Sequence, residues 1–101
     1  MALDDGDYGI GFVLVDEFSM IAFISAIEAL RLANRVTDAK PYAWIALSSD
    51  GRPVCASNGI EISVDASLNN APQLDAVFIC GGVDIQNHED RAVMAGLRRR
   101  V

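Results

Sequence analysis

The sequence predicts an α/β domain built on a mainly parallel sheet, and the order of its apolar segments carries this prediction. An apolar stretch at residues 11–15 leads into a long amphipathic helix, and a second apolar stretch at 42–47 follows that helix. A helix between two mostly apolar strands is the βαβ unit of a parallel sheet. A third stretch, 75–80, is apolar on both faces, which is typical of a strand at the centre of such a sheet.

The first strand and the helix after it organise the rest of the chain. Residues 11–15 are predicted to form a buried strand, and Ser19 to cap a helix that runs to about Asn34, because its side-chain oxygen can accept a backbone N–H bond. Polar residues recur three or four apart along this helix and form one narrow stripe: Ser25, Glu28, Arg31 and Arg35. The remaining circumference is apolar. We therefore expect a second covering besides the sheet: a further element, a missing part of the chain, or a partner subunit.

The middle of the chain predicts a second strand and a small hairpin. Residues 38–41 form a turn, and residues 42–47 the second strand. Residues 53–57 and 60–64 flank Asn58-Gly59, and both of these residues tolerate the positive φ angles of a two-residue hairpin turn. Ile60, Ile62 and Val64 are expected to share one face of this hairpin. The segment 65–72 is expected to be a turn that contains a single helical turn.

The last third of the chain predicts a strand, a glycine turn and a second helix. The strand at 75–80 stops at Gly81-Gly82, where the backbone can turn sharply. Asn87 is a suitable cap for a helix that runs through Leu97 to the arginines at 98–100. Three arginines at that end complement the negative end of the helix dipole. The alternative, a nucleic-acid patch, is disfavoured by the acidic balance of the chain.

Composition excludes several classes of function. The chain has 101 residues, enough for one domain with a core, and 14 acidic against 8 basic residues give a net charge of −6, which repels phosphate backbones. Cys55 and Cys80 are too few for a disulfide scaffold, and no motif predicts a metal or a cofactor. No secretory signal or membrane span is recognisable, so we expect a cytoplasmic protein. Residues 1–8 are predicted to be a flexible tail, and residues 9–101 to belong to one domain.

The candidate site lies where two strands end. In an open α/β sheet, ligands bind beyond the carboxyl ends of the strands, and adjacent first and last strands would bring six residues to one mouth. These residues are Asp16, Glu17, Phe18, Gly81, Gly82 and Val83. Two of these predictions have a simpler alternative: the acids favour a helix start, and the glycines form either a tight turn or an anion-holding pair of amides. Cys80 and His88 are interpreted as structural, because neither has a recognisable catalytic partner.

Three blocks of the sequence resemble a known domain. They are GFVLVDEFSMIAFISAIEALRLANR, SSDGRPVCASNGIEISVDASL and LDAVFICGGVD, and together they are similar to the N-terminal domain of AraC-type transcriptional regulators of the GlxA kind. That domain belongs to the class I glutamine amidotransferase-like superfamily, which includes the PfpI peptidases and the Parkinson-disease deglycase. The resemblance covers residues 10 to about 95. It implies a three-layer, flavodoxin-like fold, of which this chain holds only the first half.

The resemblance also implies a function. Such domains form homodimers, sense a small metabolite, and control DNA binding by a separate C-terminal pair of helix-turn-helix motifs that this chain does not contain. Regulators with similar segments often serve the catabolism of amino acids or quaternary amines, such as arginine, carnitine or glycine betaine. A cationic effector is consistent with Asp16, Glu17 and Phe18, because carboxylates and aromatic faces attract cations. We therefore predict a ligand-sensing and dimerisation domain.

The same resemblance predicts that the chain is not an enzyme. The superfamily's enzymes use a Glu early in the first helix, and that position falls on Ala22. Gly81-Gly82 correspond to the turn that supplies oxyanion-hole amides, but the nucleophilic cysteine follows a further strand, and neither Cys55 nor Cys80 occupies its place. The alternatives are a truncated PfpI- or deglycase-type cysteine hydrolase and a purely dimerising scaffold. Without that further strand, the edge beside 75–80 and part of the helix face would be open, and we expect dimerisation there.

Overall fold

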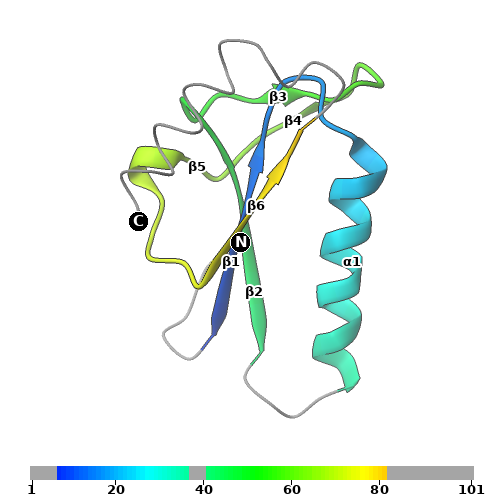
Figure 1. Cartoon of the computed structure of the whole chain (residues 1–101), viewed down its shortest axis with the longest axis vertical. Helices are drawn as coiled ribbons and strands as arrows, with labels where there is room; N and C mark the ends of the chain where they lie inside the picture. The colour runs from blue at the N-terminus through cyan, green and yellow to red at the C-terminus, as the bar shows by residue number, and fades with distance from the viewer. Residues whose placement is uncertain (1–6, 37–40, 82–101) are drawn as a thin grey trace.

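The computed structural model describes residues 7–36 and 41–81. Along the chain these form β1 (Tyr8–Leu14), α1 (Met20–Val36), β2 (Tyr42–Ser48), β3 (Val54–Cys55), β4 (Glu61–Ile62), β5 (Ala66–Ser67), the 3-10 helix η1 (Leu68–Asn70) and β6 (Ala76–Cys80) (Figure 1). The single helical turn predicted within 65–72 is η1. The predicted helix from Asn87, the arginines at 98–100, the turn at 38–40 and nearly all of the predicted tail lie outside the described residues.

A four-stranded sheet with the order β5-β2-β1-β6 confirms the predicted parallel arrangement. β1 pairs in parallel with β2 on one side and with β6 on the other, and β2 pairs in parallel with β5. α1 connects β1 to β2, as the βαβ prediction requires. The fold is therefore flavodoxin-like: α/β, with a mainly parallel sheet and a small antiparallel pair, β3 with β4.

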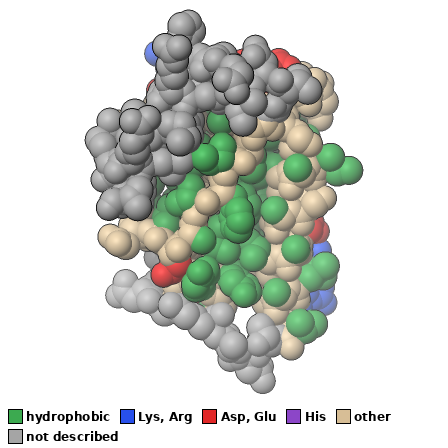
Figure 2. Space-filling view, in the orientation of Figure 1, with side chains coloured by type: hydrophobic (Ala, Val, Ile, Leu, Met, Phe, Trp, Pro, Cys, Tyr) green, Lys and Arg blue, Asp and Glu red, His purple; other side chains and the backbone are tan. Residues whose placement is uncertain are grey.

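β6 occupies the edge of the sheet within the described residues, although its two apolar faces predicted a central strand. Phe78 and Ile79 are consequently exposed. Among the described residues β6 pairs with β1 alone, and the open edge that the resemblance implies beside residues 75–80 stays a prediction. Figure 2 shows hydrophobic side chains gathered on this side of the molecule, between β6 and α1. A strand of this composition is suited to burial on both faces. The described residues do not bury β6 in this way.

The first strand begins three residues earlier than its apolar run predicts, because polar groups hold its start. The N–H of Tyr8 donates to the carbonyl of Pro41 at 2.9 Å. The N–H of Gly9 donates to Oδ2 of Asp75 at 2.7 Å, and the N–H of Asp75 donates back to the carbonyl of Gly9 at 2.8 Å. Tyr8, assigned to the tail by the sequence, is therefore the first residue of β1.

Two side chains fix the ends of α1. The hydroxyl of Ser19 accepts the N–H of Ala22 at 3.3 Å, which confirms the predicted cap. At the other end, the amide of Asn34 donates to the carbonyl of Tyr42 and accepts its N–H, both at 2.8 Å. Asn34 thereby pairs with the backbone as a neighbouring strand would, and it fixes the last turns of α1 against the start of β2.

The sheet has an apolar layer on each face. On the α1 side the buried core consists of Ile10, Phe12, Leu14, Phe18, Phe23, Ala46, Val54 and Ala56. On the opposite side it consists of Val13, Val15, Ile45, Leu47 and Leu68. Alternate residues of β1 therefore enter opposite layers, as the two-residue period of a strand requires. Figure 1 shows α1 on one side of the strands and η1 on the other.

The hairpin turn differs from its prediction. The N–H of Gly59 donates to the carbonyl of Ala56 at 3.0 Å, and the N–H of Ala56 donates to the carbonyl of Ile60 at 2.9 Å. Of the two turn residues, only Gly59 has a positive φ, +87°. The predicted two-residue turn is therefore wrong: the loop has three residues, and a left-handed glycine closes it. Ile60 is exposed, whereas Ile62 and Val64 pack against the core, so the predicted common face is only partly formed.

Candidate ligand-binding site

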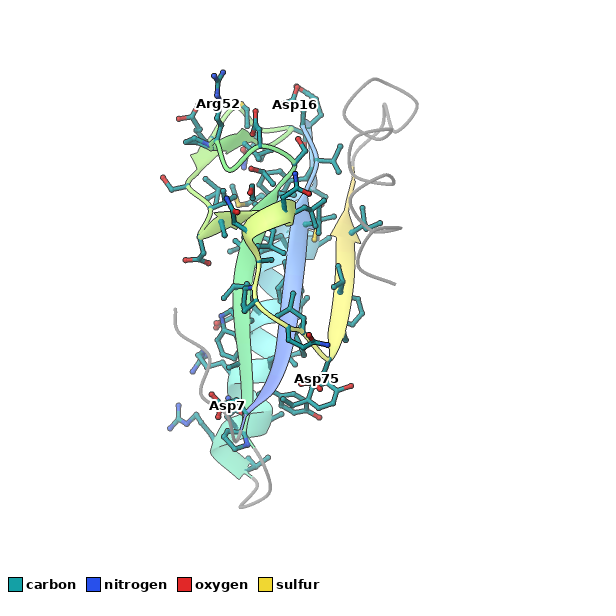
Figure 3. The ribbon with its side chains drawn as sticks, turned by 90° about the vertical axis from the view of Figure 1, so that its left-hand side faces the viewer. Asp7, Asp16, Arg52 and Asp75 are labelled. Atoms are coloured by element: carbon teal, nitrogen blue, oxygen red, sulfur yellow. The ribbon has the colours of Figure 1, made fainter. Side chains whose placement is uncertain are left out.

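The parallel strands bring their carboxyl ends to one end of the sheet. Leu14, the last residue of β1, pairs with Cys80, the last residue of β6. The chain leaves β1 through Asp16, and Figure 3 shows Asp16 and Arg52 at this end, with Asp7 and Asp75 at the other. The expected juxtaposition of the segment after β1 with the segment after β6 is therefore present in the backbone.

Two hydrogen bonds join the turn before α1 to the end of β6. The N–H of Val15 donates to the carbonyl of Cys80 at 3.0 Å, and the N–H of Ser19 donates to the carbonyl of Gly81 at 3.3 Å. Gly81 is half-buried and lies directly beside the cap of α1. Its carbonyl thus holds the start of the helix, while the choice between a tight turn and an anion-holding pair of amides stays a prediction. Gly82 and Val83 lie outside the described residues.

The β3–β4 hairpin contacts the turn before α1, and the sequence did not predict this contact. The N–H of Glu17 donates to the carbonyl of Cys55 at 2.9 Å, and the N–H of Ser57 donates to the carbonyl of Phe18 at 2.9 Å. Phe18 and Ala56 also form an isolated parallel bridge. No local sequence signal marks this contact, because it joins segments almost forty residues apart whose apolar patterns are too short to specify a partner.

Phe18 occupies the core, and this corrects its predicted place at the mouth. Its relative exposure is 0%, and its ring packs edge-on against Phe23 with the ring centroids 5.8 Å apart. Its backbone is also held by the bridge to Ala56. A side chain without exposed surface cannot present its ring face to a ligand in this structure. Its role here is to anchor the turn that carries the two acids.

Glu17 and Asp16 are the predicted site residues whose side chains reach the surface. Glu17 is exposed and Asp16 is half-buried. Glu17 has a φ of +70°, a left-handed conformation that is unfavourable for any residue with a side chain. The hydrogen bond from its N–H to Cys55 and the burial of Phe18 on its other side hold it there. Two consecutive acids at one end of the sheet make this surface attractive to cations.

The structure describes three positions that the sequence analysis considered for catalysis: Ala22, Cys55 and Cys80. Ala22 is exposed in the first turn of α1, and that turn carries no acidic residue. Burial raises the pKa of the Cys80 thiol above its ordinary value of 9.0, which disfavours the nucleophilic thiolate. Cys55 and Cys80 are both free thiols. Residues 7–36 and 41–81 contain no group of three or more His, Cys, Asp or Glu residues placed to hold a metal ion.

Among the described residues, no helix has both the length and the apolar character needed to cross a membrane.

Comparison with characterised proteins finds relatives among transcriptional regulators. The chain is 49% identical over 82 residues to the HTH-type transcriptional regulator GbdR of Pseudomonas aeruginosa, covering 81% of this chain and 22% of GbdR. It is 39% identical over 88 residues to the HTH-type transcriptional regulator CdhR of the same organism, covering 87% of this chain and 26% of CdhR. It is 28% identical over 92 residues to the HTH-type transcriptional regulator GlxA of Rhizobium meliloti, covering 91% of this chain and 28% of GlxA. The chain thus spans about a quarter of the length of these relatives.

Solved structures show the same relationship. An AraC family transcriptional regulator from Pseudomonas putida superposes with a TM-score of 0.72 at 27% identity, over 90% of this chain and 51% of that chain. A DJ-1 superfamily protein from Agrobacterium tumefaciens superposes with a TM-score of 0.61 at 21% identity, over 91% of this chain and 47% of that chain, and shows the fold alone. No family model matches the chain.

Proposed function

We propose that this chain, which is homologous over most of its length to HTH-type transcriptional regulators that include GlxA, forms part of the ligand-sensing and dimerisation domain of an AraC-type regulator. The observation that carries the proposal is the 49% identity with GbdR, which extends over 82 residues and so over 81% of the chain. DNA is contacted by a separate helix-turn-helix domain outside this chain, and the protein works in the cytoplasm.

The effector in this proposal is a small amino acid or quaternary amine. Its cationic group binds beside Glu17 and Asp16, which are the exposed and half-buried acids at the carboxyl end of the sheet. Gly81 supplies backbone groups at the end of β6, and Gly82 and Val83, which lie outside the described residues, remain part of the predicted site. Phe18 supports this surface from the core instead of contacting the cation. In this proposal the carboxylates alone bind the cationic group, whereas the sequence analysis expected the aromatic ring of Phe18 to contribute.

Binding is coupled to the start of α1. The carbonyl of Gly81 accepts the N–H of Ser19, and the hydroxyl of Ser19 caps the first turn of the helix. A ligand that moves Gly81 relative to Glu17 therefore shifts α1 against the sheet. A shift of this kind can change how two copies of the domain are oriented, and this is the coupling that a regulator needs.

Isothermal titration calorimetry with glycine betaine, carnitine and arginine as probes tests the site. We expect at least one probe to bind, and Glu17→Gln to weaken that binding about tenfold, because the variant removes a charge and keeps the shape of the side chain. The matched control is Glu61→Gln, which makes the same charge change at an exposed position in β4. Unchanged affinity in Glu17→Gln removes Glu17 from the site. Equal weakening in both variants indicates a general charge effect, and no binding by any probe contradicts the proposed effector class.

The hydrolase alternative receives no support from the described residues. An exposed methyl group at Ala22 cannot orient a nucleophile as a carboxylate would, and the raised pKa keeps the Cys80 thiol protonated at neutral pH. We therefore propose that the chain binds its ligand without transforming it.

A further inference from the structure

Arg52 lies at the same end of the sheet as the acids of the proposed site. β2 is the parallel neighbour of β1, so the segments that follow these two strands leave the sheet at one end. Asp16 follows β1 and Arg52 follows β2, and Figure 3 shows both at this end of the molecule. The other two arginines among the described residues, Arg31 and Arg35, belong to the second half of α1, which runs toward the opposite end of the sheet (Figure 1).

The turn after β2 holds the backbone of Arg52 in place. Ser48 is 2% exposed, and its hydroxyl donates to the carbonyl of Arg52 at 2.9 Å. Oδ1 of Asp50 accepts the N–H of Arg52 at 3.0 Å. Gly51, between them, has a φ of +81°, a conformation in which a side chain would be strained. The fold therefore fixes the point from which the Arg52 side chain starts.

The guanidinium of Arg52 is accessible to a ligand. The side chain is 85% exposed, and its Nε lies 3.9 Å from Oδ2 of Asp50, whose side chain is 60% exposed. An ion pair of that length between exposed groups contributes little, because water screens it. A guanidinium has N–H donors arranged to bind a carboxylate through two parallel hydrogen bonds. Arg52 therefore combines a fixed backbone with a head group suited to an anionic ligand.

The hairpin connects Arg52 to Glu17. The N–H of Glu17 donates to the carbonyl of Cys55 at 2.9 Å, and Cys55 lies three residues after Arg52. Three extended residues span at most about 11 Å, so the backbone of Arg52 is no further than that from the residue that holds Glu17. The long side chain of Arg52 shortens this gap. A ligand whose opposite charges are separated by a few bonds can therefore contact both side chains.

The effectors of the proposed function need a partner for an anion as well as for a cation. Glycine betaine, carnitine and arginine each carry a carboxylate, and a carboxylate left unpaired in a binding site costs affinity. We propose that Arg52 binds the carboxylate of a zwitterionic effector whose cationic group lies against Glu17 and Asp16. The inference rests on the proposed function and deepens it, because it assigns the preference for amino acids and betaines over simple amines to one residue.

Probes with and without a carboxylate test this assignment by isothermal titration calorimetry. Choline is the carboxylate-free counterpart of glycine betaine and carnitine, and agmatine is that of arginine. We expect the carboxylate-bearing probe to bind about tenfold more tightly than its counterpart. Arg52→Gln should weaken the carboxylate-bearing probe about tenfold and leave its counterpart unchanged. Arg52→Lys should recover only part of the preference, because lysine keeps the charge without the two-pronged geometry.

The matched control is Arg35→Gln, the same change at an exposed residue of α1, which should leave both affinities unchanged. Circular dichroism checks that each variant folds. If Arg52→Gln leaves the preference for the carboxylate intact, or weakens both probes equally, Arg52 does not bind this group and the inference is overturned. Weakening of both probes by Glu17→Gln would still support the proposed function in that case. Absence of binding by every probe overturns the inference together with the proposed effector class.

Discussion

Glu17 has the only positive φ among the non-glycine residues in the described part of the chain, +70°. This conformation costs a residue with a Cβ about 1–2 kcal/mol, a cost that glycine does not incur. In ordinary helix or strand positions, alanine is instead the more stable of the two by about 0.5–1 kcal/mol. Whether the glycine or the alanine variant at position 17 is the more stable therefore shows which backbone conformation this residue adopts.

We predict that Glu17→Gly is more stable than Glu17→Ala by about 1 kcal/mol, the reverse of the usual order. The measurement is urea unfolding of the two variants under identical conditions. An alanine variant at least as stable as the glycine variant would show that Glu17 is not held in the left-handed region. Both variants should weaken ligand binding as Glu17→Gln does, because all three lack the carboxylate.

The site could be predicted in part, since its acids and glycines follow strands that are recognisable by their apolar runs. The burial of Phe18 could not be predicted, because a single aromatic residue after two acids has the pattern of an exposed turn. Its place in the core depends on Ala56 and on Phe23, and only the packed fold brings these together. The contact between the β3–β4 hairpin and the turn before α1 could not be predicted for the same reason.

At the scale of elements, the side chains of two aspartates accept backbone N–H bonds that a neighbouring strand would otherwise accept. Oδ2 of Asp65 accepts the N–H of Ala46 at 2.7 Å, and Oδ2 of Asp75 accepts the N–H of Gly9 at the same distance. Each aspartate also donates its own N–H to the carbonyl of the same partner, at 2.8 Å. In sequence Asp65 begins a predicted turn and Asp75 begins a predicted strand, and neither pattern indicates this side-chain pairing. In the structure each joins an incoming segment to the neighbouring strand, which explains why β1 extends further than its apolar run.

Asp75→Ala is expected to lower the free energy of unfolding by about 1–2 kcal/mol, because it leaves the N–H of the buried Gly9 without its acceptor. Asp75→Asn retains an acceptor oxygen and should lose less than half as much. Urea unfolding of both variants gives the comparison, and hydrogen exchange at Gly9 locates the effect. Equal losses in the two variants would assign the effect to the charge of Asp75 instead of its hydrogen bond.

The elements themselves were predictable to different degrees. β2 and α1 have long periodic or apolar patterns and a strong cap at Ser19, and the structure places both within two residues of their predicted bounds. The hairpin was correctly located, but its loop type depends on whether Asn58 or only Gly59 adopts a positive φ. Both residues can adopt it, so composition alone does not choose between the two loops.

At the scale of the whole molecule, α1 contacts both the proposed site and the sheet. Gly81 of the proposed site touches the start of the helix, because its carbonyl accepts the N–H of Ser19, and Phe23 packs the helix against the sheet. The sequence indicated that α1 would be covered on more than one side, but it could not say which covering comes from the same domain. That distinction needs the direction of the helix relative to the sheet, which the position of Phe23 supplies.

Stability of the whole chain should depend on pH at both ends of the accessible range. The hydrogen bonds from Arg31 hold the pKa of Glu28 below its ordinary value of 4.5, so the unfolded chain takes up that proton first and stability falls below about pH 4.5. Burial holds the pKa of Cys80 above 9.0, so the unfolded chain releases that proton first and stability falls as the pH rises above 9.0. Urea unfolding from pH 3.5 to 10 measures both arms, and Glu28→Gln and Cys80→Ala should each flatten only one of them. Because Glu28 is solvent-exposed and Cys80 is half-buried, screening by water makes the acidic arm the shallower of the two. An alkaline arm unchanged in Cys80→Ala would mean that this thiol is as accessible in the folded chain as in the unfolded one, contrary to its position at the end of β6.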